Sequence, residues 1–281
     1  MRQKKRRRRT VIEAYVGDGT TYARLGRRWG VDRSTAYRRL MRALKGRIRV
    51  IARTKRLLTK CDGICLLDGK HLRIGRRLFT IYVAWDRGLG RPINVHIREG
   101  GESDMGYWHL LVGLTHAGYA PKAFVSDGYP ALKAFIAETY PDLPHQRCVV
   151  HTFMWVRSVV APGKRKSWRQ HSFVELARRI LWARNFLIAK RRLEKLTAMR
   201  LLNPKEKKAL AIMASALEQV FTNADARWRN LHLPRSSNAI ENVMGQIEAR
   251  LKTRRGTKSI AAIDALINEI LLRVKRQIIN Q

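Results

Sequence analysis

The order of strand-like and helix-like segments in the middle of the chain constrains its fold more than any other feature. Three runs rich in β-branched and aromatic residues come first, separated by turns that contain glycine: residues 64–74, 76–86 and 92–100. Helical periodicity then alternates with short apolar runs, with helices expected at residues 103–118 and 130–141 and strands at residues 122–127 and 146–153. A meander followed by this alternation predicts an α/β fold in which helices cover a mixed sheet.

A second pattern precedes the sheet. Residues 22–44 predict two short helices around a tight turn at Gly30, with Asp32 or Ser34 as the cap of the second helix. This is the spacing of a helix-turn-helix, whose second helix enters the major groove of DNA. The side chains expected to face DNA are Arg33, Thr35, Arg38 and Arg39. The alternative is an ordinary helical hairpin with a basic face in solvent.

The charge of the chain narrows its possible partners. Lys and Arg number 58 against 21 Asp and Glu, and a formal net charge of +37 favours a polyanion, because bound phosphates release condensed counterions. Double-stranded DNA is the leading candidate, and an anionic membrane surface is the second. The longest apolar run, residues 78–85, is too short to cross a bilayer. Three cysteines and a basic N-terminus with no apolar run after it predict a cytoplasmic protein, and DNA as its partner would make it nucleoid-associated.

Two aspartates end strand-like runs. Asp68 closes "ICLLD" and Asp127 closes "FVSD". If the two strands are neighbours, both carboxylates emerge at one end of the sheet, where they could share metal ions that clamp the attacking and leaving oxygens of a phosphodiester. Mg²⁺ or Mn²⁺ is the expected cofactor, because hard cations take oxygen ligands. The alternative for each aspartate is a turn residue, since glycine follows both.

A third carboxylate would complete such a metal site, and Glu241 is the candidate. At about 100° per residue, the apolar residues of 240–251 form one stripe of the expected helix, and Glu241 lies at its edge. Glu248 lies near the same edge two turns later, about 10.5 Å along the axis, so only one of the two could join the site. Alternatively, Asn238 and Glu241 form a capping box, and Glu241 has no chemical role.

The residues around these acids resemble those of a known family. The run "EGGESDMGYWHLLVGLTHAGYAPKAFVSDGYPALKAFIAETYPDLPHQRCVVHTF", followed downstream by "NAIEN", is similar to the Mutator-type transposases, including their bacterial insertion-sequence relatives. The resemblance implies a ribonuclease-H-like core with an Asp-Asp-Glu triad and a helical insertion before the glutamate. It assigns the catalytic and metal-binding roles to Asp68, Asp127 and Glu241. The family's Cys-x-x-His pair matches Cys148 and His151, which the resemblance implies as active-site support.

Other residues have competing interpretations. Cys148 and His151 could form half of a zinc site with Cys61 and Cys65, but Cys65 lies in an apolar strand, where a buried cysteine is more usual. Three tryptophans among arginines could stack on unpaired bases, although the favoured interpretation places them in a helical core. They are Trp155, Trp168 and Trp182.

With this resemblance the chain divides into five parts: a basic arm and helix-turn-helix (1–46), a linker (47–60), the first part of a ribonuclease-H-like core (61–155), a helical insertion (156–233) and the C-terminal helices of the core (234–281). The expected function is DNA transposition, in which a homo-oligomer on DNA cleaves the ends of a mobile element and transfers them to target DNA. The alternatives are a structure-selective DNA nuclease of the same fold and a domesticated, non-catalytic DNA-binding protein.

The positive charge predicts steeply salt-dependent DNA binding. Neutralised phosphates release counterions, so we expect the affinity for duplex DNA to fall by roughly 10³-fold or more between about 50 and 200 mM salt. Fluorescence anisotropy with a labelled duplex measures this dependence. A flat titration would contradict the electrostatic argument.

Overall fold

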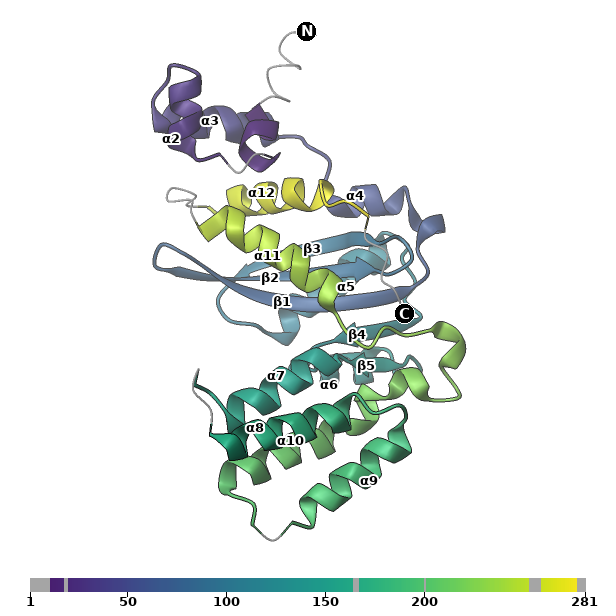
Figure 1. Cartoon of the computed structure of the whole chain (residues 1–281). Helices are drawn as coiled ribbons and strands as arrows, with labels where there is room; N and C mark the ends of the chain where they lie inside the picture. Colours follow the sequence, from purple (N-terminus) through teal and green to yellow (C-terminus); the bar gives the residue numbers. More distant parts are fainter. Residues whose placement is uncertain (1–10, 18–19, 164–166, 200, 253–258, 277–281) are drawn as a thin grey trace. The chain divides into compact units, whose positions relative to one another are not determined.

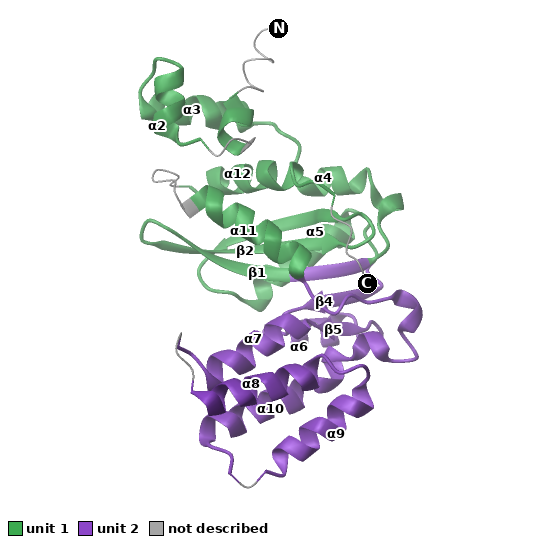
Figure 2. Cartoon of the chain, viewed as in Figure 1, with its two compact units in different colours: residues 1–63, 68–120, 238–278 green, residues 64–67, 121–237, 279–281 purple. Residues whose placement is uncertain are grey.

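A computed structural model of the chain describes residues 11–17, 20–163, 167–199, 201–252 and 259–276 (Figure 1). The basic arm at residues 2–9 lies outside this set. Within it, no helix has both the length and the apolar character needed to span a membrane. The chain forms two compact units (Figure 2): unit 1 comprises residues 1–63, 68–120 and 238–278, and unit 2 comprises residues 64–67, 121–237 and 279–281.

Five strands form one mixed sheet in the order β3-β2-β1-β4-β5. They are β1 (Ile64–Ile74), β2 (Arg77–Asp86), β3 (Arg91–Glu99), β4 (Ala123–Ser126) and β5 (His145–Arg147). β2 and β3 pair antiparallel, whereas β4 pairs parallel with both β1 and β5. Residues 64–68 of β1 are buried without alternation, which is typical of a central strand covered on both faces. The mixed α/β architecture predicted from the order of segments is therefore confirmed.

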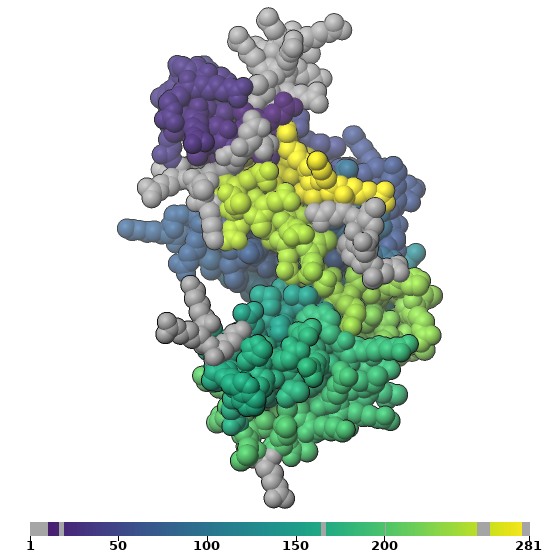
Figure 3. Space-filling model, in the orientation of Figure 1, coloured from purple at the N-terminus to yellow at the C-terminus, as the bar shows by residue number. Residues whose placement is uncertain are grey.

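In unit 1, helices pack against the strands. Three of them contact β3: α4 (Val50–Lys55), α5 (Asp104–His116) and α12 (Ile260–Leu272). α11 (Asn238–Lys252) reaches β1, where Glu248 Oε2 forms an ion pair with Lys70 Nζ at 3.2 Å. Figure 3 shows α11 and α12 lying over the strands of unit 1 on the visible face. α12 ends at Leu272.

The two helices predicted before the sheet are α2 (Tyr22–Arg28) and α3 (Arg33–Leu44). Asp32 caps α3, because its Oδ1 accepts hydrogen bonds from the backbone N–H groups of Ser34 and Thr35 at 2.8 and 2.9 Å. Gly26 lies where α2 approaches the turn, and a Cβ at this position would lie 2.5 Å from the carbonyl oxygen of Val31. Glycine therefore permits the close packing of the turn against α2.

Unit 2 is mostly helical. After β4 comes α6 (Pro130–Thr139), and after β5 come α7 (Val149–Val160), α8 (Trp168–Leu181), α9 (Phe186–Thr197) and α10 (Pro204–Val220). The buried apolar side chains of α7–α10 form one cluster. Arg169 at the start of α8 donates to the buried carboxylate of Glu206 at the start of α10, with distances of 2.9 and 2.7 Å. This ion pair and the shared core hold the helices together.

Four short helical turns lie before or between the longer elements of the described residues. They are η1 (Glu13–Gly17), η2 (Leu58–Lys60), η3 (Thr222–Ala224) and η4 (Arg229–Leu231). The predicted linker, residues 47–60, contains α4 and η2.

The strand predicted at residues 146–153 is wrong for most of its length. β5 ends at Arg147, and Cys148 is the cap residue of α7. The buried positions of α7 recur every three or four residues, which is the period of a helix: Val149, Thr152, Val156 and Val160. Cys148 and His151 therefore lie on one helical turn instead of on an extended strand.

The prediction that the three tryptophans belong to a helical core is also wrong. Trp155, Trp168 and Trp182 are 47%, 84% and 41% exposed. Trp168 is the first residue of α8 and Trp182 is its C-cap, while Trp155 lies off the buried stripe of α7. None of the three belongs to the buried cluster of this unit, although Trp182 packs edge-to-face on Phe153 at its margin. Stacking on unpaired bases stays a prediction.

Substitution of Gly26 by alanine should destabilise the α2–α3 region, because the new methyl group would overlap a backbone carbonyl oxygen. We expect a loss of roughly 1–3 kcal/mol in the free energy of unfolding. Gly245 in α11 is the matched control, since nothing lies within 4 Å of a Cβ there. Alanine at Gly245 should keep or raise stability, by up to about 1 kcal/mol. Urea denaturation followed by circular dichroism compares the variants, and equal stability would contradict the close approach at Gly26.

Candidate functional site

The register of β1 and β4 positions the two predicted aspartates. The parallel pairing aligns Ile64 with Ala123, Cys65 with Phe124 and Leu66 with Val125. Asp68 follows two residues after Leu66, and Asp127 follows two residues after Val125. Asp68 still belongs to β1 and is 7% exposed, whereas Asp127 stands just beyond the end of β4. The two aspartates thus occupy equivalent positions along neighbouring parallel strands.

Asp127 lies in a turn of unit 2 that hydrogen bonds hold in place. Its Oδ1 accepts from the backbone N–H of Tyr129 at 2.9 Å, and the N–H of Gly128 donates to Ser126 Oγ at 3.2 Å. Ser126 Oγ lies 2.7 Å from His145 Nε2. Burial, reinforced by nearby positive charges, lowers the pKa of His145 to about 4. The Nε2 of a neutral imidazole can accept a hydrogen bond from the serine hydroxyl, so His145 helps to fix the turn that carries Asp127.

Glu241 lies in the first turn of α11 at the edge of its buried face. That face contains the predicted apolar stripe, at most 2% exposed: Ile240, Val243, Met244, Ile247 and Leu251. Glu248, the other candidate on this edge, forms the ion pair with Lys70. The role of Glu241 as the third carboxylate stays a prediction.

The start of α11 places Glu241 in the first turn of the helix. The helix begins at Asn238, so Glu241 is its fourth residue. The metal-ligand and capping-box interpretations of Glu241 both stay predictions.

Cys148 and His151 share a neighbour that the sequence did not identify. The backbone N–H of Ser237 donates to Cys148 Sγ, and Ser237 Oγ lies 3.4 Å from His151 Nδ1. Burial raises the pKa of the Cys148 thiol, but hydrogen bonds from His151 and Ser237 outweigh it, and the net pKa is lowered. Ser237 carries no motif of its own; its only signal is that it stands four residues before Glu241.

The structure gives no support to a zinc site built with the other two cysteines. Cys65 is fully buried in β1, and Cys61 Sγ donates to the carbonyl oxygen of Leu57 at 3.8 Å. Among the described residues, neither cysteine belongs to a group of three potential metal ligands. Cys65 is therefore a small apolar residue of the sheet core.

The four predicted DNA-binding residues lie on α3. Arg33, Arg38 and Arg39 are exposed, and Thr35 is partly buried and accepts a hydrogen bond from Arg38 Nη2 at 3.1 Å. The helix therefore presents three guanidinium groups to solvent. DNA contact by these residues stays a prediction.

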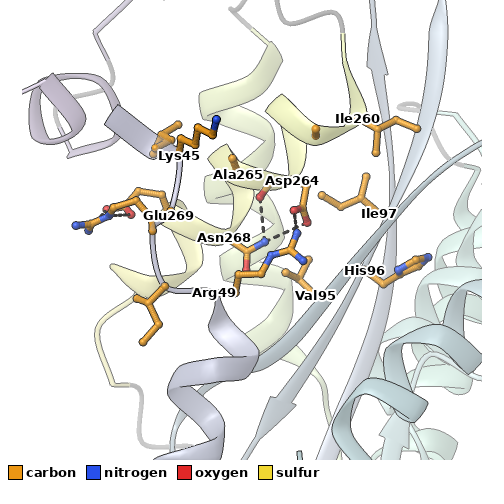
Figure 4. A pocket seen from close by; sticks show the side chains of 15 residues that line it. Lys45, Arg49, Val95, His96, Ile97, Ile260, Asp264, Ala265, Asn268 and Glu269 are labelled. Atoms are coloured by element: carbon orange, nitrogen blue, oxygen red, sulfur yellow. Dashed lines mark hydrogen bonds and ion pairs between the residues drawn. The ribbon is translucent and has the colours of Figure 1, made fainter. Parts of the chain in front are cut away.

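A cavity of about 710 Å³ in unit 1 lies between the segment after α3, strand β3 and α12 (Figure 4). Two ion pairs lie in its lining: Arg47 donates to Glu269 at 3.1 and 3.2 Å, and Arg49 pairs with Asp264. The residues that line the cavity do not include the three predicted acids. These ion pairs attach the linker to α12, which is a structural role.

Comparison with known proteins identifies the family. The model of the Mutator family of transposases matches residues 80–279, more than half of the chain, so the chain belongs to this family. The match includes Asp127, Cys148, His151 and Glu241 and begins after Asp68. No curated protein matches the chain.

Among solved structures, the chain is similar to one in the cryo-EM structure of the simian T-cell lymphotropic virus intasome in complex with PP2A regulatory subunit B56 gamma. The identity is 16%, the similarity covers 75% of this chain and 68% of that chain, and the TM-score is 0.26. At this TM-score the similarity indicates neither a shared fold nor a shared activity.

His145 predicts a pH dependence of stability. Its pKa is about 4 in the folded protein against an ordinary value of 6.5, so between these pH values only the unfolded chain binds the proton. The stability from neutral His145 is complete above pH 6.5 and is lost as the pH falls towards 4, by up to about 3 kcal/mol. Denaturation at neutral and acidic pH measures the loss. His145→Gln keeps a hydrogen-bond acceptor that does not titrate, so this variant should lose less stability than the wild type as the pH falls. Equal losses of stability in the two proteins would exclude His145 as the cause.

Proposed function

We propose that this member of the Mutator family is an Asp-Asp-Glu transposase with a ribonuclease-H-like core. Asp68, Asp127 and Glu241 act together on a phosphodiester of DNA. The observation that carries the proposal is the β1–β4 register, which gives the two aspartates equivalent positions on neighbouring parallel strands. Membership of a transposase family supports the same conclusion.

The donor set suits Mg²⁺ or Mn²⁺, because carboxylate oxygens are the ligands that hard divalent cations prefer. Asp68, Asp127 and Glu241 would hold the cation. When bound, it would stabilise charge on the attacking and leaving oxygens of the phosphoryl group. The turn around Asp127 supports this role, since its hydrogen bonds direct the carboxylate before any ligand binds.

The remaining residues position the reacting groups. Ser237, held by Cys148 and His151, steadies the start of α11 and therefore the position of Glu241. Arg33, Thr35, Arg38 and Arg39 contact the ends of the element through the major groove. A homo-oligomer binds both ends. Water attacks the phosphorus and the P–O3′ bond breaks, which leaves a 3′-hydroxyl on one fragment and a 5′-phosphate on the other. The 3′-hydroxyl then attacks a phosphodiester of target DNA, whose own P–O3′ bond breaks, without a covalent enzyme intermediate.

Neutral substitutions of the three acids test the proposal. Asp68→Asn, Asp127→Asn and Glu241→Gln keep the side-chain shape and remove the charge that a hard cation requires. Because even outer-shell partners of a metal site change activity by 10–100-fold, we expect each variant to lose more than about 100-fold in DNA cleavage. DNA binding and the melting temperature should change little.

Glu248→Gln is the matched control on the same helix. It removes only the surface ion pair with Lys70, which is worth about 1 kcal/mol or less, so cleavage should persist. Full activity in any of the three acid variants would overturn the triad. A strand-transfer assay on linear DNA separates the alternatives: cleavage without transfer identifies a nuclease of the same fold.

A further inference from the structure

Arg147 is a buried charge that the proposed triad does not explain. It is the last residue of β5, in register with Ser126 at the end of β4, and it is only 6% exposed. Among the described residues, its Nε and Nη2 have no hydrogen-bond partner. Burial of a charged donor without a partner is costly. Such a guanidinium points to a ligand that the protein itself does not supply.

Asp127 compensates this charge only in part. Burial lowers the pKa of Arg147, and attraction to Asp127 opposes that effect without cancelling it. The carboxylate of Asp127 accepts its hydrogen bond from Tyr129. A divalent cation at Asp127, as in the proposed function, would further reduce the negative charge available to Arg147. The guanidinium then requires a second anion.

The neighbours of Arg147 hold its side chain in one place. Gly128 has a φ of +85°, and a Cβ at this position would lie 2.5 Å from Arg147 Nε, so the turn leaves room for the guanidinium only with glycine. The ring of Trp155 lies next to the guanidinium, with 5.4 Å between Cζ and the ring centroid, which is a favourable cation–π distance. Trp155 is 47% exposed, so this side of the pair reaches solvent. The guanidinium is thus preorganised beside Asp127.

We propose that Arg147 and Trp155 form a phosphodiester-binding subsite, in which Arg147 holds a phosphate of the DNA strand adjacent to the one that reacts at Asp127. The exposed part of Trp155 contacts the neighbouring base or sugar. This assignment rests on the proposed function, since it places both phosphates in one DNA strand. The planar guanidinium matches two phosphate oxygens, and an indole stacks on any base. A polyanionic ligand also agrees with the net charge of +37.

The first test measures how salt changes the affinity for duplex DNA without divalent cations. Loss of one phosphate contact should lower the slope of log K against log salt concentration by about 0.9 in Arg147→Met. The affinity should fall by roughly 10-fold or more, because a charge-assisted hydrogen bond is lost. Arg147→Lys keeps the charge and should keep a slope near that of the wild type. If Arg147→Met does not fold, Arg147→Lys provides the test. This variant should bind duplex DNA more weakly than the wild type, with an unchanged salt slope, because it keeps the charge and loses the planar guanidinium.

Arg235→Met is the matched control. Arg235 is a partly buried arginine of the same unit that lies over an aromatic ring, Phe221, but donates to the carbonyl oxygen of Leu181. Its loss should lower stability and leave the salt slope unchanged.

The second test measures the melting temperature without DNA. Met keeps much of the length of Arg147 and removes an uncompensated buried charge, so Arg147→Met should melt at the same temperature as the wild type or higher. If Arg147 served only as the structural ion-pair partner of Asp127, Arg147→Met would melt at a lower temperature than the wild type. Adding Arg147→Met to the Asp127→Asn variant would then lower the melting temperature no further.

An unchanged salt slope in Arg147→Met, or a destabilised Arg147→Met coupled to Asp127, would overturn the subsite. A failure of the proposed function would give another result. The three acid variants would then keep their cleavage activity, while Arg147→Met would still lower the salt slope. In that case the subsite would be a DNA contact with no link to catalysis. A wild-type protein that binds no DNA would overturn both.

Discussion

The parallel pairing of β1 with β4 is the interaction on which the rest of the structure depends. Parallel strands require a long crossover, and here the intervening chain supplies β2, β3 and α5. A slip of one residue would turn every side chain of the pair to the other face, so burial of the apolar runs fixes the register. The same register sets the positions of Asp68 and Asp127. Packing can therefore hold two like charges at equivalent strand positions, where their mutual repulsion alone would separate them.

Scarce carboxylates have specific structural partners in this basic chain. Glu206 accepts from Arg169 between two helices, and Glu269 accepts from Arg47 and so attaches the linker to α12. Asp86, which also ends a strand, is fully buried and accepts hydrogen bonds from the backbone N–H groups of Asp62, Gly63 and Leu89 and from the hydroxyl of Tyr119. Such carboxylates fix segments that are remote in sequence, because a buried acid without its partner is costly. Because 58 basic residues outnumber 21 acidic ones, the electrostatic potential around the protein stays positive.

Local patterns were sufficient to predict much of the fold. The β-rich runs before residue 100 and the apolar stripe of α11 depend only on spacing along the chain, and both are present in the structure. The end of β5 at Arg147 was predicted wrongly, because the two consecutive valines that follow Cys148 suit a strand and a helix alike. Contacts of α7 with α10 and α8 decide between them, and these partners lie later in the sequence.

Some residues of the candidate site could likewise be predicted from local sequence patterns, and others depend on contacts distant in sequence. An acid after a strand-like run is a local signal, so Asp68 and Asp127 could be proposed from the sequence. Glu241 and Glu248 lie on the same helix edge, and the contact of Glu248 with Lys70, in a strand distant in sequence, could not be predicted from their spacing. Arg147 is one of 58 basic residues and carries no signal in the sequence. Its interest comes from burial beside Asp127 with donors that lack a partner among the described residues. Where a residue type is abundant, its environment rather than its presence indicates a function.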